Sequence, residues 1–165
     1  MLGEVARGFA SELSVDVDDG RVADFASSVG HWRPFEDSPA ALRTLGDRYR
    51  LAIVSNVDDD LFAGSAAQLG IDFDEVVTAL QVRSYKPARA HFDEVLRRLE
   101  LPRARVLHVA QSLHHDIAPA RALGFTCVWV DRRADRPGAG ATPASEATPH
   151  ARVPDLASLV ELVGL

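Results

Sequence analysis

The stretch "VLHVAQSLHHDIAPARALG", residues 106–124, decides the fold because it joins a buried strand to a helix through a short polar loop. Its first part is an apolar run with one histidine, which is typical of a strand covered on both faces. Its last part, 116–124, ends in glycine, as helices commonly do. The apolar run "FTCVWV", residues 125–130, follows at once. This order predicts a parallel strand–helix–strand unit.

The same alternation extends upstream of this unit. It predicts strands at 50–55, 74–80, 105–110 and 125–130, with helices at 38–46, 58–70, 88–100 and 116–124. We therefore predict an α/β fold, a doubly wound parallel sheet with helices on both faces. Two short helices, 4–13 and 21–29, precede it. Residues 131–153 predict a flexible loop rich in Pro, Ala, Gly and Thr, and a helix ends the chain.

Composition narrows the class of protein. The 165 residues carry a net charge of −6 and are 47% hydrophobic, which suits one globular domain with a core of its own. There is no basic footprint for nucleic acid, and no run approaches the roughly 20 apolar residues that cross a bilayer. The single cysteine, Cys127, lies in an apolar run and is expected to be buried. We expect a cytoplasmic protein that binds neither nucleic acid nor membrane.

Polar residues follow the predicted strands, where ligands bind in open α/β sheets. Ser55 and Asn56 follow the first strand and offer a hydroxyl and an amide to an anion, or cap the next helix. Lys86 stands before Pro87 at a helix entrance, as a fixed cation or as a surface lysine. Gln111 and Ser112 follow the third strand. Asp116 lies at the start of the next helix, as a site residue or as a cap.

The histidines of the opening stretch do not form an obvious metal site. His108 lies inside the predicted strand and is expected to be a core residue. His114 and His115 are adjacent, so on a helix they point about 100° apart and do not easily share one ion. No cysteine or paired histidine spacing lies nearby. We expect no metal ligand among them.

Taken in order, these segments resemble a known family. "LAIVSN" (51–56), "VRSYKPARAHF" (82–92) and residues 106–124 resemble the second, third and fourth motifs of the haloacid dehalogenase superfamily. "HWRPFEDSPAALRTL" (31–45) resembles the junction between that family's helical cap and its core. The nearest branch is that of the type II 2-haloacid dehalogenases. The resemblance implies that residues 1–37 are the C-terminal part of a cap and that residues 38–165 are a Rossmann-like core.

The resemblance also implies a mechanism. An aspartate on the first core strand attacks the substrate and forms an ester, which water then hydrolyses. Lys86 would stabilise that carboxylate and the developing charge, and Asp116 would orient Lys86 or the water. The substrate-binding residues it implies are Ser55, Asn56, Gln111 and Ser112. The substrate would be a small anionic 2-haloacid whose carbon–halogen bond is hydrolysed without metal or organic cofactor.

The sequence departs from the family at several of these positions. Phosphatase members carry a Gly-Asp pair that helps to bind Mg²⁺, where this chain has Ala110 and Gln111. Gln is neutral, so this favours metal-free dehalogenation. Leu113 and Phe92 replace an Asn and a Tyr that are frequent among dehalogenases. A Mg²⁺-dependent phosphatase that uses Asp116, and a non-catalytic anion-binding or assembly module, remain the alternatives.

The nucleophile strand itself has no obvious counterpart. Fewer than four residues precede the first predicted helix, and the Asp-rich "LSVDVDDGR" (13–21) offers only a short run before Asp16. We therefore expect an N-terminally incomplete member of the family, which lacks the nucleophile strand. A strand at 13–17 beside 50–55 would contradict this expectation. The edge left in the sheet makes a homodimer possible.

Overall fold

A computed structural model describes residues 2–133 and 142–165. The α-helices are α1 (Leu2–Glu12), α2 (Asp19–Ser27), α3 (Ser38–Gly46), α4 (Asp59–Leu69), α5 (Ala79–Val82), α6 (Ala90–Leu99), α7 (Ala118–Ala122) and α8 (Leu156–Leu162). The strands are β1 (Ala52–Ser55), β2 (Glu75–Thr78), β3 (Leu107–Ala110), β4 (Thr126–Val130) and β5 (Ala151–Val153). Two 3₁₀-helices, η1 (Ser28–His31) and η2 (Arg103–Arg105), and the π-helix η3 (Leu113–Ile117) complete the described elements.

Every strand pairing among the described residues is parallel, as predicted, but the strands form two groups. β1 pairs with β2, with Ile53 opposite Val76. β3, β4 and β5 form the second group, with His108 opposite Cys127 and Val130 opposite Val153. Within the described residues no strand pairing joins β1 to β3. The two groups therefore turn one strand edge each toward a position that no described strand fills.

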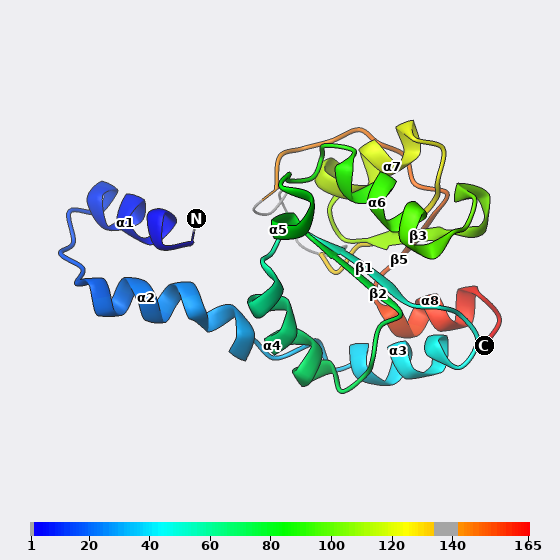
Figure 1. Cartoon of the computed structure of the whole chain (residues 1–165), viewed down its shortest axis with the longest axis horizontal. Helices are drawn as coiled ribbons and strands as arrows, with labels where there is room; N and C mark the ends of the chain where they lie inside the picture. The colour runs from blue at the N-terminus through cyan, green and yellow to red at the C-terminus, as the bar shows by residue number, and fades with distance from the viewer. Residues whose placement is uncertain (1, 134–141) are drawn as a thin grey trace.

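Helices cover both faces of the strands, which confirms the doubly wound fold class (Figure 1). Successive side chains of β4 point to opposite faces, as in any strand. Val128 and Val130 pack with Leu45 of α3 and Leu159 of α8. On the other face, Cys127 packs with a cluster that includes Phe92 and Ile117.

Cys127 itself behaves as the sequence predicts. It is fully buried, and burial raises the pKa of its thiol to about 11. The residue is a packing element of the core, since a thiol with a pKa this high is not ionised near neutral pH.

The predicted loop 131–153 contains one element that the sequence analysis missed. Residues 134–141 lie outside the described residues, but β5 forms at the end of this segment and pairs with β4. Val153 is buried in the core cluster of α3 and α8. A three-residue strand is too short to give a recognisable alternation, so the neighbouring Pro, Ala and Thr residues dominated the pattern.

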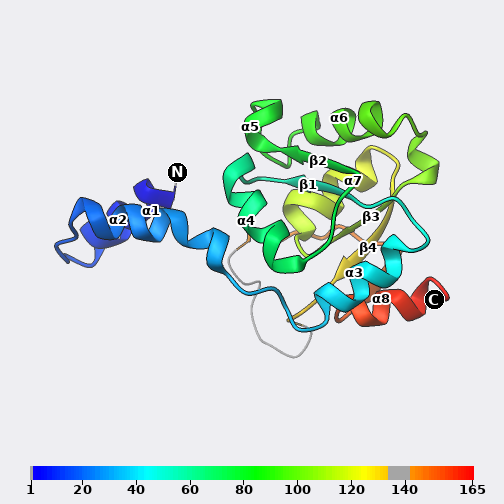
Figure 2. The ribbon, with the colours of Figure 1, turned by 60° about the horizontal axis from the view of Figure 1, so that its bottom comes forward.

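The first two helices form an arm that projects from the α/β body (Figure 2). Residues 13–18 connect α1 to α2 in this arm and form no strand, so the outcome that would contradict the missing-strand expectation is not observed. Asp18 caps α2 by accepting from the Arg21 backbone N–H at 2.9 Å. The assignment of residues 1–37 to a cap stays a prediction.

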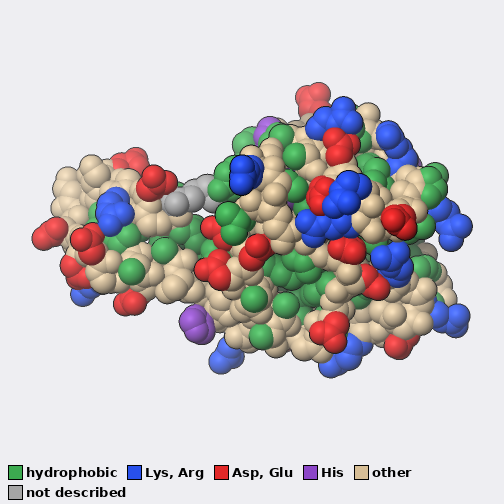
Figure 3. Space-filling view, viewed as in Figure 1, with side chains coloured by type: hydrophobic (Ala, Val, Ile, Leu, Met, Phe, Trp, Pro, Cys, Tyr) green, Lys and Arg blue, Asp and Glu red, His purple; other side chains and the backbone are tan. Residues whose placement is uncertain are grey.

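Acidic and basic side chains are interspersed over the body on the face shown in Figure 3. Among the described residues, no helix combines the length and apolar character needed to span a bilayer. The cytoplasmic location stays a prediction.

Candidate active site

A buried ion pair lies where the sequence places the site. Lys86 Nζ is 2.7 Å from Asp116 Oδ1, and the two side chains are only 9% and 10% exposed. Lys86 Nζ also donates to the Val54 carbonyl at 2.8 Å. The ammonium therefore lies between β1 and the segment that follows β3. The described residues accept two of its three hydrogens, which leaves one for an anion.

Lys86 is the only lysine of the chain, which otherwise uses arginine as its cation. A compact ammonium suits a buried point charge, whereas guanidinium groups favour planar, two-pronged contacts at the surface. The choice of lysine at this one position fits a role in the chemistry of the site.

The side chain of Asn56 holds the backbone of Lys86 from both sides. Its amide donates to the Lys86 carbonyl at 3.1 Å, and its carbonyl oxygen accepts the Lys86 backbone N–H at 2.7 Å. Lys86 lies in a turn between α5 and α6, so this clamp ties the turn to the end of β1. The contacts of Asn56 position Lys86, and the expected role of Asn56 in substrate binding stays a prediction.

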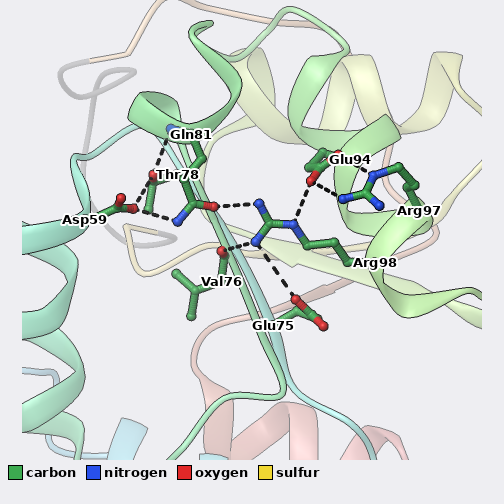
Figure 4. Close-up of polar contacts among 8 residues, drawn as sticks. All are labelled: Asp59, Glu75, Val76, Thr78, Gln81, Glu94, Arg97 and Arg98. Atoms are coloured by element: carbon green, nitrogen blue, oxygen red, sulfur yellow. Dashed lines mark hydrogen bonds and ion pairs between the residues drawn. The ribbon is translucent and has the colours of Figure 1, made fainter.

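A second set of polar contacts fixes the helices on either side of that turn (Figure 4). Arg98 of α6 donates to the Val76 carbonyl of β2 at 2.9 Å and to the Gln81 side chain of α5 at 2.8 Å. Asp59, at the start of α4, accepts from Gln81 at 2.7 Å and from Thr78 at 2.6 Å. The loop that carries Lys86 is therefore anchored at both ends.

Asp116 does not cap a helix, which corrects that reading of the sequence. It lies inside η3, whose cap is Ser112, the acceptor of the His115 backbone N–H at 3.0 Å. The Ile117 N–H bonds to the Ser112 carbonyl five residues back, at 3.1 Å. Such π-turns are frequent at functional sites, and this one carries Asp116 into the buried space beside Lys86.

Among the described residues, the side chains of Gln111 and Ser112 make no hydrogen bond to the side chains of Lys86 and Asp116. Gln111 is exposed, and its backbone carbonyl accepts Trp129 Nε1 at 2.8 Å. The Ser112 hydroxyl also contacts the His115 ring at 3.1 Å, besides capping η3. Their assignment to substrate binding stays a prediction.

Two buried histidines complete the site, and sequence reasoning gave neither a role in it. His108 Nε2 is 3.3 Å from Asp116 Oδ1, the oxygen that also faces Lys86. His91 is fully buried, and its Nε2 lies 3.0 Å from the Ser55 carbonyl. Ser55 thus contributes its backbone, and no contact of its hydroxyl is seen among the described residues. The motif "SYKPARAHF" contains His91, but no pattern in it pointed to the site.

The surroundings lower the pKa values of both Asp116 and His91, which favours the charged form of the aspartate and the neutral form of the histidine. Burial raises the pKa of Asp116, but the contacts from His108 and Lys86 outweigh it and hold that pKa below its ordinary value. Burial lowers the pKa of His91, aided by the charge of Lys86 and opposed by the Ser55 carbonyl and Asp116. At neutral pH the site therefore holds a carboxylate and a neutral His91.

The described residues contain no group of three or more His, Cys, Asp or Glu side chains arranged to hold a metal ion. His114 and His115 contact each other edge to face, with ring centroids 4.9 Å apart. The nearest neighbours of the Asp116 carboxylate are cationic or imidazole nitrogens. Lys86 Nζ keeps one hydrogen for an anion, so the arrangement suits an anion better than a cation.

Comparison with known proteins identifies the class that this fold and site define. The model of the haloacid dehalogenase-like hydrolases matches residues 19–130. The chain belongs to this family. It lies near the 2-haloacid dehalogenase branch, since it is 29% identical over 147 residues to (S)-2-haloacid dehalogenase H-109 of Pseudomonas putida. That match covers 87% of this chain and 65% of the relative.

Other relatives widen the range of chemistry. A glyceraldehyde 3-phosphate phosphatase of Methanothermobacter thermautotrophicus is 33% identical over 102 residues, covering 60% of this chain and 45% of the relative. The solved L-2-haloacid dehalogenase of Xanthobacter autotrophicus superposes with a TM-score of 0.83 at 25% identity, over 98% of this chain and 73% of that one. The chain thus spans 45–65% of the length of these curated relatives.

Proposed function

We propose that this chain carries the lysine–aspartate part of a hydrolytic site that cleaves the carbon–halogen bond of a small 2-haloacid. An aspartate carboxylate displaces the halide from carbon and forms an ester. Water then attacks the ester, which releases the 2-hydroxyacid and restores the carboxylate. The observation that carries this proposal is the buried Lys86–Asp116 pair, with one ammonium hydrogen left for an anion.

The contacts of the site support a role for each residue. Lys86 stabilises the attacking carboxylate and the charge that develops, and its fixed position lowers the reorganisation that the reaction requires. Asn56 holds the Lys86 backbone in place. Asp116, ionised at neutral pH, holds Lys86 Nζ in place and orients the water.

The attacking aspartate is proposed to come from a strand outside this sequence. Lys86 Nζ contacts the Val54 carbonyl of β1 and the Asp116 carboxylate of η3, the element that follows β3. No described strand pairs with the free edge of β1 or with that of β3. A strand paired in parallel with β1 would end at the same edge as Ser55 and Asn56, beside the Lys86 turn that Asn56 holds. An aspartate at its end would accept the remaining ammonium hydrogen.

The test is to join the chain to an upstream segment in which an apolar strand ends in aspartate. Halide release from 2-chloropropionate and phosphate release from a phosphate ester with Mg²⁺ are measured in parallel. We expect halide release and no phosphate release. Phosphate release without halide release would contradict the proposal.

The phosphatase is the second candidate, and the similarity to the Methanothermobacter phosphatase favours it. Against it, Ala110 and Gln111 stand where phosphatase members carry the Gly-Asp pair, and Asp116 already faces Lys86 and His108. Binding of 2-chloropropionate with turnover of neither substrate would instead support the anion-binding module.

A further inference from the structure

His108 is placed to act on the ion pair, although it lies within a strand. It belongs to β3, and its side chain is 9% exposed. Its ring packs edge to face against Phe92, with centroids 5.3 Å apart, and against Phe125 at 6.4 Å. Two aromatic rings therefore restrict the imidazole, which fixes where its Nε2 can point.

Among the described residues, the polar group that faces that nitrogen is the carboxylate of Asp116. His108 Nε2 is buried, and within the described part of the chain it makes no hydrogen bond of ordinary geometry. It lies 3.3 Å from Asp116 Oδ1. A carboxylate only accepts hydrogen bonds, so a lone pair at Nε2 would face the oxygen unfavourably. The arrangement therefore requires hydrogen on Nε2.

Both donors meet the same carboxylate oxygen. Lys86 Nζ approaches Oδ1 at 2.7 Å and His108 Nε2 approaches it at 3.3 Å. No described residue hydrogen-bonds Oδ2. Lys86 thus bonds one oxygen of the carboxylate and His108 faces the same oxygen, while the other oxygen is left to accept a hydrogen from water.

We propose that His108 is a positioning residue of this site: its Nε2–H fixes Asp116 Oδ1 so that Oδ2 is presented to the hydrolytic water. This inference rests on the proposed function for the role of that water. The contact between His108 and Asp116, however, exists without turnover and is tested without it.

The single lysine makes a clean test in the chain as it stands. Labelling with ¹³C,¹⁵N-lysine gives one set of side-chain signals, and the Lys86 Cε shift reports protonation of Asp116 as the pH is lowered. In Asp116→Asn the inflection in the Lys86 Cε shift should disappear, which shows that it arises from Asp116. Far-UV circular dichroism at each pH defines the range in which the chain is folded.

We expect no inflection above pH 4 in the parent chain. In His108→Phe the inflection moves up by about one pH unit, since a hydrogen bond to a charged group is lost. His108→Gln, which keeps an N–H, restores most of the parent behaviour. His114→Phe is the matched control, because His114 is two residues from Asp116 without contacting it, and leaves the parent behaviour unchanged.

Two results would overturn the inference. One is a folded His108→Phe that shows the same titration as the parent chain. The other is a ¹⁵N-histidine spectrum in which neutral His108 carries its hydrogen on Nδ1; this readout needs no variant and so does not depend on any variant folding. Absence of halide release from the chain extended by an aspartate-bearing strand, with both spectroscopic results as expected, would count against the proposed function and leave the His108 contact standing.

Discussion

At the scale of single residues, the site is a small set of buried polar groups that depend on one another. Lys86 and Asp116 are each about nine-tenths buried, and neither is tolerable there alone, because a buried charge without a partner loses its hydration and gains nothing in return. Such pairs add little net stability compared with apolar residues. Their presence in the core is therefore better explained by chemistry than by folding.

Breaking the pair from one side should be costly. In Asp116→Asn the Lys86 charge stays buried without its counterion, so we expect the free energy of unfolding to fall by roughly 3–5 kcal/mol. Lys86→Met combined with Asp116→Asn should recover part of this loss. Asp93→Asn, which removes an exposed pair with Arg89, should cost less than about 1 kcal/mol. Urea unfolding at pH 7 measures all three, and equal costs for Asp116 and Asp93 would refute the argument.

His91 should make stability depend on pH near neutrality. Its pKa in the folded chain lies below the ordinary 6.5, so the unfolded chain binds more protons as the pH drops below that value. Its contribution is therefore complete above pH 6.5 and is lost as the pH falls toward the folded pKa. His91→Gln keeps a donor for the Ser55 carbonyl and cannot be protonated.

The measurement is the urea midpoint between pH 7 and pH 5. We expect a shallower decrease in His91→Gln than in the parent chain. His31→Gln, at an exposed position of the arm, serves as the control and should leave the slope unchanged. A parent slope retained in His91→Gln would show that another group is responsible.

Site residues could be predicted from the sequence only where their position directly after a predicted strand identified them. Lys86 and Asp116 follow predicted strands, and topology brings such positions together. The roles of Asn56 and His108 could not be predicted in this way, because they depend on where side chains point. An inserted π-turn also changes the direction of Asp116, and nothing local in "SLHHDI" indicates it.

At the scale of elements, the arm meets the body at a crossing of two backbones. Gly30 of η1 and Gly64 of α4 approach so closely that a Cβ at Gly64 would lie 2.7 Å from the Gly30 Cα. The segment that joins the arm to α3 is also held, because Arg132 contacts both carboxylate oxygens of Asp37 at 2.9 and 3.0 Å. These contacts set where the arm begins relative to the site.

Gly64→Ala should therefore loosen the arm. Alanine is normally better than glycine inside a helix by about 1 kcal/mol, but here the clash is with backbone and cannot be relieved by a rotamer change. We expect a lower unfolding midpoint and faster limited proteolysis between α2 and α3. Gly8→Ala in α1, where no atom lies within 4 Å of the new Cβ, should be neutral or stabilising. Equal behaviour of the two variants would contradict this account of the crossing.

Most elements could be predicted from the sequence because their patterns are long. Helix α6 and the strands β1 to β4 lie within the expected ranges, since apolar runs mark the strands and apolar residues at helical spacing mark α6. β5 could not be predicted, because three residues in a Pro- and Thr-rich segment carry no period. The absence of pairing between β1 and β3 could not be predicted either, because strand pairing depends on residues far apart in the sequence.

At the scale of the whole molecule, the two strand groups leave β1 and β3 with unfilled edges among the described residues. Exposed strand edges favour pairing with other chains. We expect the chain to associate as its concentration rises through the micromolar range. Sedimentation velocity at several concentrations measures this, with the upstream-extended chain as the control that should remain monomeric. A cooperatively folded monomer at every concentration would argue against open edges.

The measurement that tests the central claim most directly is halide release from 2-chloropropionate by three matched proteins. These are the chain alone, the chain extended by a strand ending in aspartate, and the same extension ending in asparagine. We expect halide release from the aspartate extension alone, and its loss on Lys86→Ala. Release by the unextended chain that is lost in Lys86→Ala would contradict an external nucleophile and direct attention to Asp16.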